Sequence, residues 1–258
     1  MTKPKAIFFD LDGTLLSSGI MPKTAGESLV YAKNKGILLF IATGRHKNEI
    51  KNVLGDSSLF DGYVSVNGGY CYAGSEVIYK NPIAKSDISF AVEYTKNSPL
   101  TCMFCETNEM YINISDKYAE QINKALSLTL PPIKNIERAL DEDIYQLVIF
   151  SNELKDVFEK NLKHSSLTSW TTDCYDVVPT TTNKWVGIQH MLKHFNLHPS
   201  EVAAIGDGTN DIEMLTGAGH PIAMGNAIDE LKKIAKYVTR HVDDGGIKHA
   251  VEWLLLSK

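Results

Sequence analysis

Four short clusters of acidic, basic and hydroxyl-bearing residues stand at the ends of apolar runs or at the start of an amphipathic one. They are Asp10-Leu11-Asp12-Gly13-Thr14, Thr43-Gly44-Arg45, Lys184, and Gly206-Asp207-Gly208-Thr209-Asn210-Asp211. Taken singly, each has a plain structural explanation as a turn, a strand end, a solvated lysine or a helix cap. Brought together, they would place several carboxylates beside one ammonium group, and such crowding of negative charge is costly without a cation.

These residue types suit the hydrolysis of a phosphate monoester. Enzymes acting on such bonds reach rate enhancements of up to about 10²¹, so their sites must stabilise much charge. A carboxylate such as that of Asp10 can act as the nucleophile and split the displacement into formation and hydrolysis of an acyl phosphate. Mg²⁺ held by Asp10 and Asp207 would supply the countercharge that lets one anion attack another. Asp12 could protonate the leaving alkoxide and then activate water, a contribution of roughly 10² to 10⁴ in rate.

The oxygens of the transferred phosphoryl group also need partners. The Lys184 ammonium, the Thr43 hydroxyl and backbone N–H groups near Leu11 and Gly44 would bind its equatorial oxygens. This chemistry requires all four clusters to meet at one place, so the elements that carry them must converge.

Two stretches of the chain alternate strand and helix patterns in a way that would achieve this. The first has continuous apolar runs at 6–10 and 37–42 around an amphipathic segment at about 22–35. The second predicts helices at 184–195, after Asn210 and up to Leu255, with strands at 202–205 and 221–224. Runs without polar alternation suit parallel strands covered on both faces. The pattern predicts an α/β fold with a doubly wound parallel sheet, in which ligands bind outside the carboxyl ends of the strands.

The piece between these stretches, residues 82–182, predicts an inserted α+β domain, and residues 1–81 and 183–258 then form one discontinuous core domain. The expected strands of the inserted domain are 101–104, 111–114 and 146–150, and its expected helices are 87–97, 118–126 and 153–162. Before the insertion, Asn67-Gly68-Gly69 between runs at 63–66 and 70–72 is a good hairpin signal, because these residues tolerate positive φ.

Composition excludes several classes of function. The formal net charge is −5, and only 3 of the 26 basic residues are arginine. No basic stripe therefore suits a nucleic-acid backbone. The chain lacks an apolar run of about 18 residues, so we expect no membrane partner. The first residues lack the pattern of a signal peptide. The four cysteines are widely spread, and the one close pair, Cys102 and Cys105, lies in an apolar run, as expected for buried thiols in a reducing compartment. We therefore expect a cytoplasmic protein.

The four clusters, in this order, resemble the four motifs of the haloacid dehalogenase (HAD) superfamily. The long insertion, Asn183-Lys184, the GDGTND sequence and Met224-Gly225-Asn226-Ala227 resemble its Cof-type (type IIB) sugar-phosphatase branch. The resemblance implies a Rossmann-like core and a cap domain. It also implies Asp10 as nucleophile and metal ligand, Asp12 as acid/base with its backbone carbonyl on the metal, Asp207 as the remaining ligand, and Leu11, Thr43, Gly44, Lys184 and Asn210 as phosphate-binding groups, with Asp211 supporting Lys184 or the metal shell.

The same resemblance separates related chemistries. Dehalogenases of the superfamily lack the second aspartate of the first motif, so Asp12 indicates phosphoryl transfer to water or to a sugar. The expected function is a Mg²⁺-dependent phosphatase for a small phosphorylated metabolite, a sugar phosphate being one candidate. A phosphomutase and a non-catalytic module that binds a phosphorylated ligand remain alternatives. One departure is Trp185, which follows the lysine where this branch usually has glycine.

Overall fold

The computed structural model describes residues 3–55, 58–125, 129–171 and 173–256. It divides into two compact units, the first comprising residues 1–45, 49–79 and 183–258 and the second residues 46–48 and 80–182. Each unit has its own sheet and its own hydrophobic core. No helix in the described part of the chain combines the length and apolar character needed to cross a bilayer.

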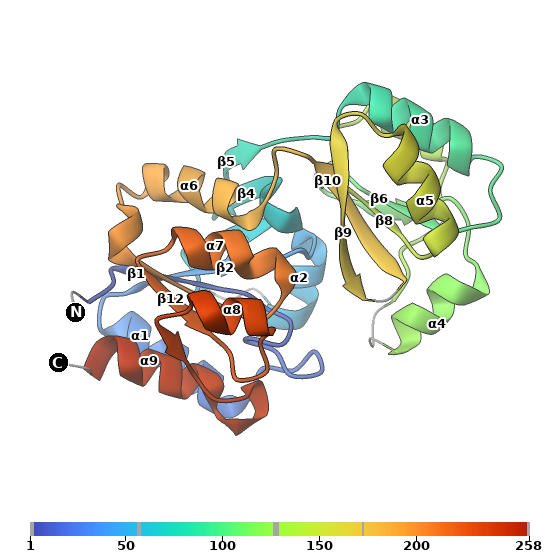
Figure 1. Ribbon diagram of the computed structural model, residues 1–258. Helices are drawn as coiled ribbons and strands as arrows, with labels where there is room; N and C mark the ends of the chain where they lie inside the picture. Colours follow the sequence, from blue (N-terminus) through green and yellow to red (C-terminus); the bar gives the residue numbers. More distant parts are fainter. Residues whose placement is uncertain (1–2, 56–57, 126–128, 172, 257–258) are drawn as a thin grey trace. The chain divides into compact units, whose positions relative to one another are not determined.

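The first unit is built on an eight-stranded sheet (Figure 1). Its strands are β1 (Ala6–Phe9), β2 (Leu38–Ala42), β3 (Gly62–Ser65), β4 (Tyr70–Ala73), β5 (Glu76–Lys80), β11 (Val202–Gly206), β12 (His220–Ala223) and β13 (Tyr237–Val238). Their order is β13-β12-β11-β1-β2-β3-β4-β5. The pairs from β13 to β3 are parallel, and β4 returns antiparallel to β3. The predicted α/β fold with a mostly parallel, Rossmann-like sheet is confirmed.

Helices cover both faces of this sheet. Figure 1 shows α1 (Lys23–Asn34) and α9 (Gly246–Leu256) side by side on one face, with α6 (Lys184–His194) and α7 (Ile212–Gly217) on the other. The short helices α2 (Lys47–Leu54) and α8 (Asp229–Ile234) complete the alternation of strand and helix. This arrangement explains the apolar runs seen in the sequence, since every residue of β1 is buried on one face or the other.

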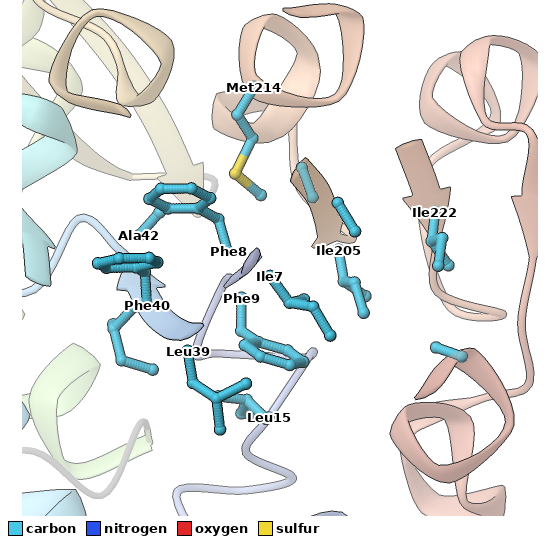
Figure 2. Close-up of a cluster of buried hydrophobic side chains, with 14 of the residues drawn as sticks. Ile7, Phe8, Phe9, Leu15, Leu39, Phe40, Ala42, Ile205, Met214 and Ile222 are labelled. Carbon is cyan, nitrogen blue, oxygen red and sulfur yellow. The ribbon is translucent and has the colours of Figure 1, made fainter. Parts of the chain in front are cut away.

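The core of the first unit fixes the central strand firmly. Figure 2 shows Phe8 stacked on Phe40 beside Met214, while Ile7 and Phe9 point to the opposite side. The rings of Phe8 and Phe40 are nearly parallel, with centroids 4.6 Å apart. Full burial of such side chains contributes roughly 1.5–3 kcal/mol each. The end of β1 is therefore a rigid point from which a functional side chain can be presented.

Strand register brings three of the polar clusters to one edge of the sheet. Phe9, at the end of β1, pairs with Ile41 of β2 on one side and Ile205 of β11 on the other. The backbone N–H of Asp10 then donates to the Ile205 carbonyl oxygen at 3.0 Å, which continues the ladder past the strand end. The residues that follow all three strands therefore emerge together, as parallel strands require.

The second unit has a five-stranded antiparallel sheet in the order β7-β6-β8-β10-β9. Its elements are α3 (Lys85–Thr95), β6 (Cys102–Cys105), β7 (Met110–Ile112), α4 (Lys117–Ala125), β8 (Gln146–Ile149), α5 (Asn152–Asn161), β9 (Ser165–Thr171) and β10 (Cys174–Pro179). The predicted strands and helices lie within a few residues of these, although the last residue of the expected helix 118–126 lies outside the described residues. Sequence patterns missed β9, because its Ser- and Thr-rich run has no clear apolar alternation, and they also missed β10.

His46 gives the second unit a predicted dependence on pH. Its ring is buried, with Nε2 lying 2.8 Å from the Glu106 carbonyl oxygen, and burial lowers the pKa of His46 to about 4. The unfolded chain takes up this proton near the ordinary pKa of about 6.5, so acidification favours unfolding between pH 6.5 and 4. We expect His46→Gln to abolish this component, which amounts to about 3 kcal/mol at pH 4. Denaturant unfolding of parent and variant measures this difference. If the free energy of unfolding fell equally in both proteins between pH 6.5 and 4, His46 would not be the group responsible.

Candidate active site

Asp10 lies at the carboxyl end of the central strand and is 6% exposed. Lys184, which is fully buried, donates from Nζ to Asp10 Oδ1 at 2.6 Å and to Asp211 Oδ1 at 2.5 Å. The lysine is the first residue of α6, and the side chain of Asn183 caps this helix by accepting from the Val186 N–H at 2.9 Å. One ammonium thus bridges carboxylates that are far apart in the sequence.

The loop after β11 is held in shape by Asp211. Its Oδ2 accepts from the backbone N–H groups of Asp207 and Gly208, at 2.9 and 3.0 Å. This carboxylate leaves no space for a side chain at Gly206, where a Cβ would lie 2.5 Å from Asp211 Cγ. Asp211 therefore ties the loop to Lys184.

Asp207 accepts hydrogen bonds from Thr14 of the first cluster and from Asn226. The Thr14 hydroxyl donates to Asp207 Oδ1 at 2.7 Å, and Asn226 Nδ2 donates to Asp207 Oδ2 at 3.3 Å and to the Gly13 carbonyl oxygen at 2.8 Å. Gly13 has φ +80°, and a Cβ there would lie 2.2 Å from Asp207 Oδ2. Only glycine allows the first and fourth clusters to approach this closely.

The carboxylates outnumber the buried cation between them. Ligand oxygens of Asp10, Asp207 and Asp211 lie within 4.8 Å of one another. Burial raises the pKa of Asp10 well above its ordinary value; Lys184 opposes this, while Asp211 and Asp207 add to it. Burial likewise raises the pKa of Asp207 to about 6. Burial acts to lower the pKa of Lys184, but Asp10 and Asp211 outweigh it and hold the lysine charged. An all-oxygen donor set with excess negative charge fits a hard divalent cation.

Asp12 faces a different partner. Its carboxylate forms a bidentate pair with Arg45, at 2.6 Å from Nε to Oδ2 and 2.7 Å from Nη2 to Oδ1, and its side chain is half-exposed. The three-carboxylate group found among the described residues does not include it. The Asp12 side chain is thus separate from the acidic group, which is compatible with a metal ligand role for its backbone carbonyl alone. The sequence pattern includes Arg45 in the second cluster but does not predict this pairing.

The expected phosphate-binding residues lie on the loops at this same edge. Thr43 is buried, and its Oγ1 accepts from the Arg45 N–H at 3.2 Å. Leu11 is fully buried, and its carbonyl accepts hydrogen bonds from the backbone of the following turn. Asn210 donates from Nδ2 to Asn67 Oδ1 at 3.1 Å. The phosphate-binding roles of these residues stay predictions, as do the catalytic and metal-binding roles of the aspartates.

Trp185 departs from the expected pattern without disturbing the lysine. Its indole lies against Gly217 at the end of α7, where an added Cβ would come within 2.1 Å of the ring. The larger side chain is thus accommodated by a glycine on the neighbouring helix. It packs against the core of the first unit.

The family model described as haloacid dehalogenase-like hydrolase matches residues 7–251. The chain belongs to this family. The resemblance inferred from the four clusters is therefore confirmed, and so is the conclusion that the protein is an enzyme of the hydrolase class.

Several relatives of this haloacid dehalogenase-like hydrolase bear the names of phosphatases. The 5-amino-6-(5-phospho-D-ribitylamino)uracil phosphatase YwtE of Bacillus subtilis (strain 168) is 30% identical over 283 residues, spanning 97% of this chain and 98% of the relative. The solved HAD subclass IIB sugar phosphatase BT4131 is 32% identical, with a TM-score of 0.85 over 96% of this chain and 98% of its own. BT1666 of Bacteroides thetaiotaomicron, also among HAD phosphatases, is 29% identical, with a TM-score of 0.83 and coverages of 98% and 95%. The likeness thus extends over both units.

Proposed function

We propose that this hydrolase is a Mg²⁺-dependent phosphatase that cleaves small phosphate monoesters through a phosphorylated Asp10. The observation that carries the proposal is the buried Lys184 bridge between Asp10 and Asp211, with Asp207 close enough to share a cation with both. Such an arrangement matches a site that binds a phosphoryl dianion beside a carboxylate nucleophile.

The chain's own residues can perform both halves of the reaction. With Oδ1 of Asp10 bound to Lys184, Oδ2 is the oxygen that would attack phosphorus, forming the acyl phosphate while the ester P–O bond breaks. Asp12 would donate a proton to the departing alkoxide and then remove one from the water that attacks the acyl phosphate, which releases phosphate and restores Asp10. Mg²⁺, held by the carboxylates of Asp10 and Asp207 and the backbone carbonyl of Asp12, would offset the repulsion between nucleophile and substrate.

The substrate class is proposed from the relatives and from the insertion. One relative bears the name of a sugar phosphatase and another of a phosphatase for a phosphorylated ribitylamino-uracil, so we propose a small phosphorylated metabolite, sugar phosphates included. Residues 82–182 as a cap domain and a cytoplasmic location remain predictions from the sequence.

Phosphate release from p-nitrophenyl phosphate and from a panel of phosphorylated metabolites tests the proposal. We expect release with Mg²⁺ and its loss on chelation with EDTA. Release that needs a sugar bisphosphate activator would instead indicate a phosphomutase. Binding of phosphorylated compounds with no release under either condition would indicate a non-catalytic module, and full activity in EDTA would contradict the metal role.

A further inference from the structure

The chain between β3 and β4 adopts an unusual backbone conformation. Val66, Asn67 and Gly68 have φ values of +44°, +54° and +95° in succession. Asn and Gly tolerate the left-handed region, but a β-branched residue such as valine rarely enters it. Val66 and Asn67 are also buried. A simple hairpin turn explains Asn67-Gly68 but not Val66, which belongs to the run at 63–66 before the predicted turn. Strain of this kind persists only where surrounding contacts impose it.

The turn is hydrogen-bonded to the second polar cluster, Thr43-Gly44-Arg45. The Val66 N–H donates to the Arg45 carbonyl oxygen at 3.2 Å, and the Asn67 N–H donates to the Thr43 carbonyl oxygen at 3.0 Å. The Thr43 carbonyl and the Gly44 N–H belong to one peptide group, and no cis peptide bond is present in the described residues. Because a trans peptide directs its C=O and N–H in opposite directions, the turn also fixes where the Gly44 N–H points.

The side chain of Asn67 is hydrogen-bonded to the fourth polar cluster. Its Oδ1 accepts from Asn210 Nδ2 at 3.1 Å, across 143 residues of sequence. An amide nitrogen carries two N–H donors. With one donor engaged by Asn67, the rotation of the Asn210 amide is set, and the second donor would be offered to a phosphate oxygen.

Gly68 packs against the residue that precedes Lys184, the third polar cluster. A Cβ at Gly68 would lie 2.2 Å from the carbonyl oxygen of Asn183, the residue that caps α6 immediately before Lys184. The turn therefore contacts the segments that carry three of the four polar clusters, and all of these contacts lie within the first unit.

We propose that Asn67 is a positioning residue for phosphate binding, acting through the Asn210 amide and the Gly44 N–H. This inference rests on the proposed function, because it assigns a role within the same site. Asn67 needs no contact with the substrate itself. The left-handed turn lets this one residue orient donors from two of the polar clusters at once.

Substitution of Asn67 by Gly isolates the side-chain contribution, since glycine keeps the left-handed backbone and removes only the amide. The affinity for inorganic phosphate, measured by calorimetry with Mg²⁺ present, is expected to fall about tenfold, which is the scale of one hydrogen bond to a charged group. Asn196→Gly is the matched control, because Asn196 has φ +51° and is exposed beyond the end of α6. This control should bind phosphate as the parent does.

A double-mutant cycle with Asn210→Ala decides whether Asn67 acts through Asn210. We expect Asn67→Gly to weaken phosphate binding little further when Asn210 is already Ala. An equal loss in both backgrounds would indicate general damage and overturn the inference, as would unchanged affinity of the single variant. Phosphate binding without hydrolysis by the parent would refute only the proposed function, whereas no phosphate binding by the parent would refute both.

Discussion

The Asp10→Asn variant is expected to lose phosphate release by a factor on the order of 10⁴ or more, because removal of a nucleophile abolishes the covalent route. The buried Asp10 side chain has the Lys184 ammonium 2.6 Å from Oδ1, and an amide at this position can still accept that hydrogen bond. The variant should therefore fold and bind phosphate. Initial rates with p-nitrophenyl phosphate measure the effect.

The same substitution should raise stability when divalent ions are absent. Since burial and the neighbouring carboxylates raise the pKa of Asp10 in the folded chain, the charged form costs folding free energy above the unfolded-state pKa, and this cost grows as pH rises. An uncharged amide avoids it, so the unfolding temperature of Asp10→Asn at neutral pH in EDTA should exceed that of the parent.

Asp244→Asn is a suitable control for both measurements. Asp244 is exposed, so the same chemical change should alter neither activity nor stability appreciably. If Asp10→Asn released phosphate at the parental rate, Asp10 would not be the nucleophile. If it were less stable than the parent in EDTA, the proposed excess of negative charge would be wrong.

Replacement of Lys184 by Met is expected to have the largest effect on stability. The side chain is fully buried between Asp10 and Asp211, so its loss leaves two buried carboxylates without their cation. Breaking a buried ion pair in this way typically costs about 3–5 kcal/mol. Denaturant unfolding at neutral pH in EDTA measures the cost, and phosphate affinity should also fall, because the ammonium is a proposed ligand of the phosphoryl oxygens.

Lys33→Met provides the matched comparison. Lys33 lies 2.6 Å from Asp61, the same separation as between Lys184 and Asp10, but its side chain is 33% exposed. We expect this change to cost no more than about 1 kcal/mol, because the Lys33–Asp61 pair is partly exposed and solvent screens it. The double variant Lys184→Met/Asp10→Asn should recover part of the lost stability, since it removes one of the stranded charges. Equal costs for both lysines, or no recovery, would mean that charge burial does not govern this site.

The sequence predicted the sheet of the first unit because its strands are continuous apolar runs, and it predicted the place of the polar clusters because parallel strands end at one edge. Contacts between individual side chains could not be predicted from these patterns. The Arg45–Asp12 pair depends on the path of two loops, and the Asn67–Asn210 hydrogen bond depends on a left-handed turn and a rotamer. The strand pattern through residue 66 even concealed that turn, since valine is a strong strand former.

The order of strands in the first unit has a consequence for synthesis of the chain on the ribosome. β1 is flanked by β2, which follows it closely, and by β11, which is made about two hundred residues later. Until that late segment emerges, one hydrogen-bonding edge of a wholly apolar strand has no neighbour, and such edges favour aggregation. The second unit, apart from residues 46–48, is one continuous stretch, so its sheet can form earlier. Nascent chains should thus depend on chaperones for the first unit more than for the second.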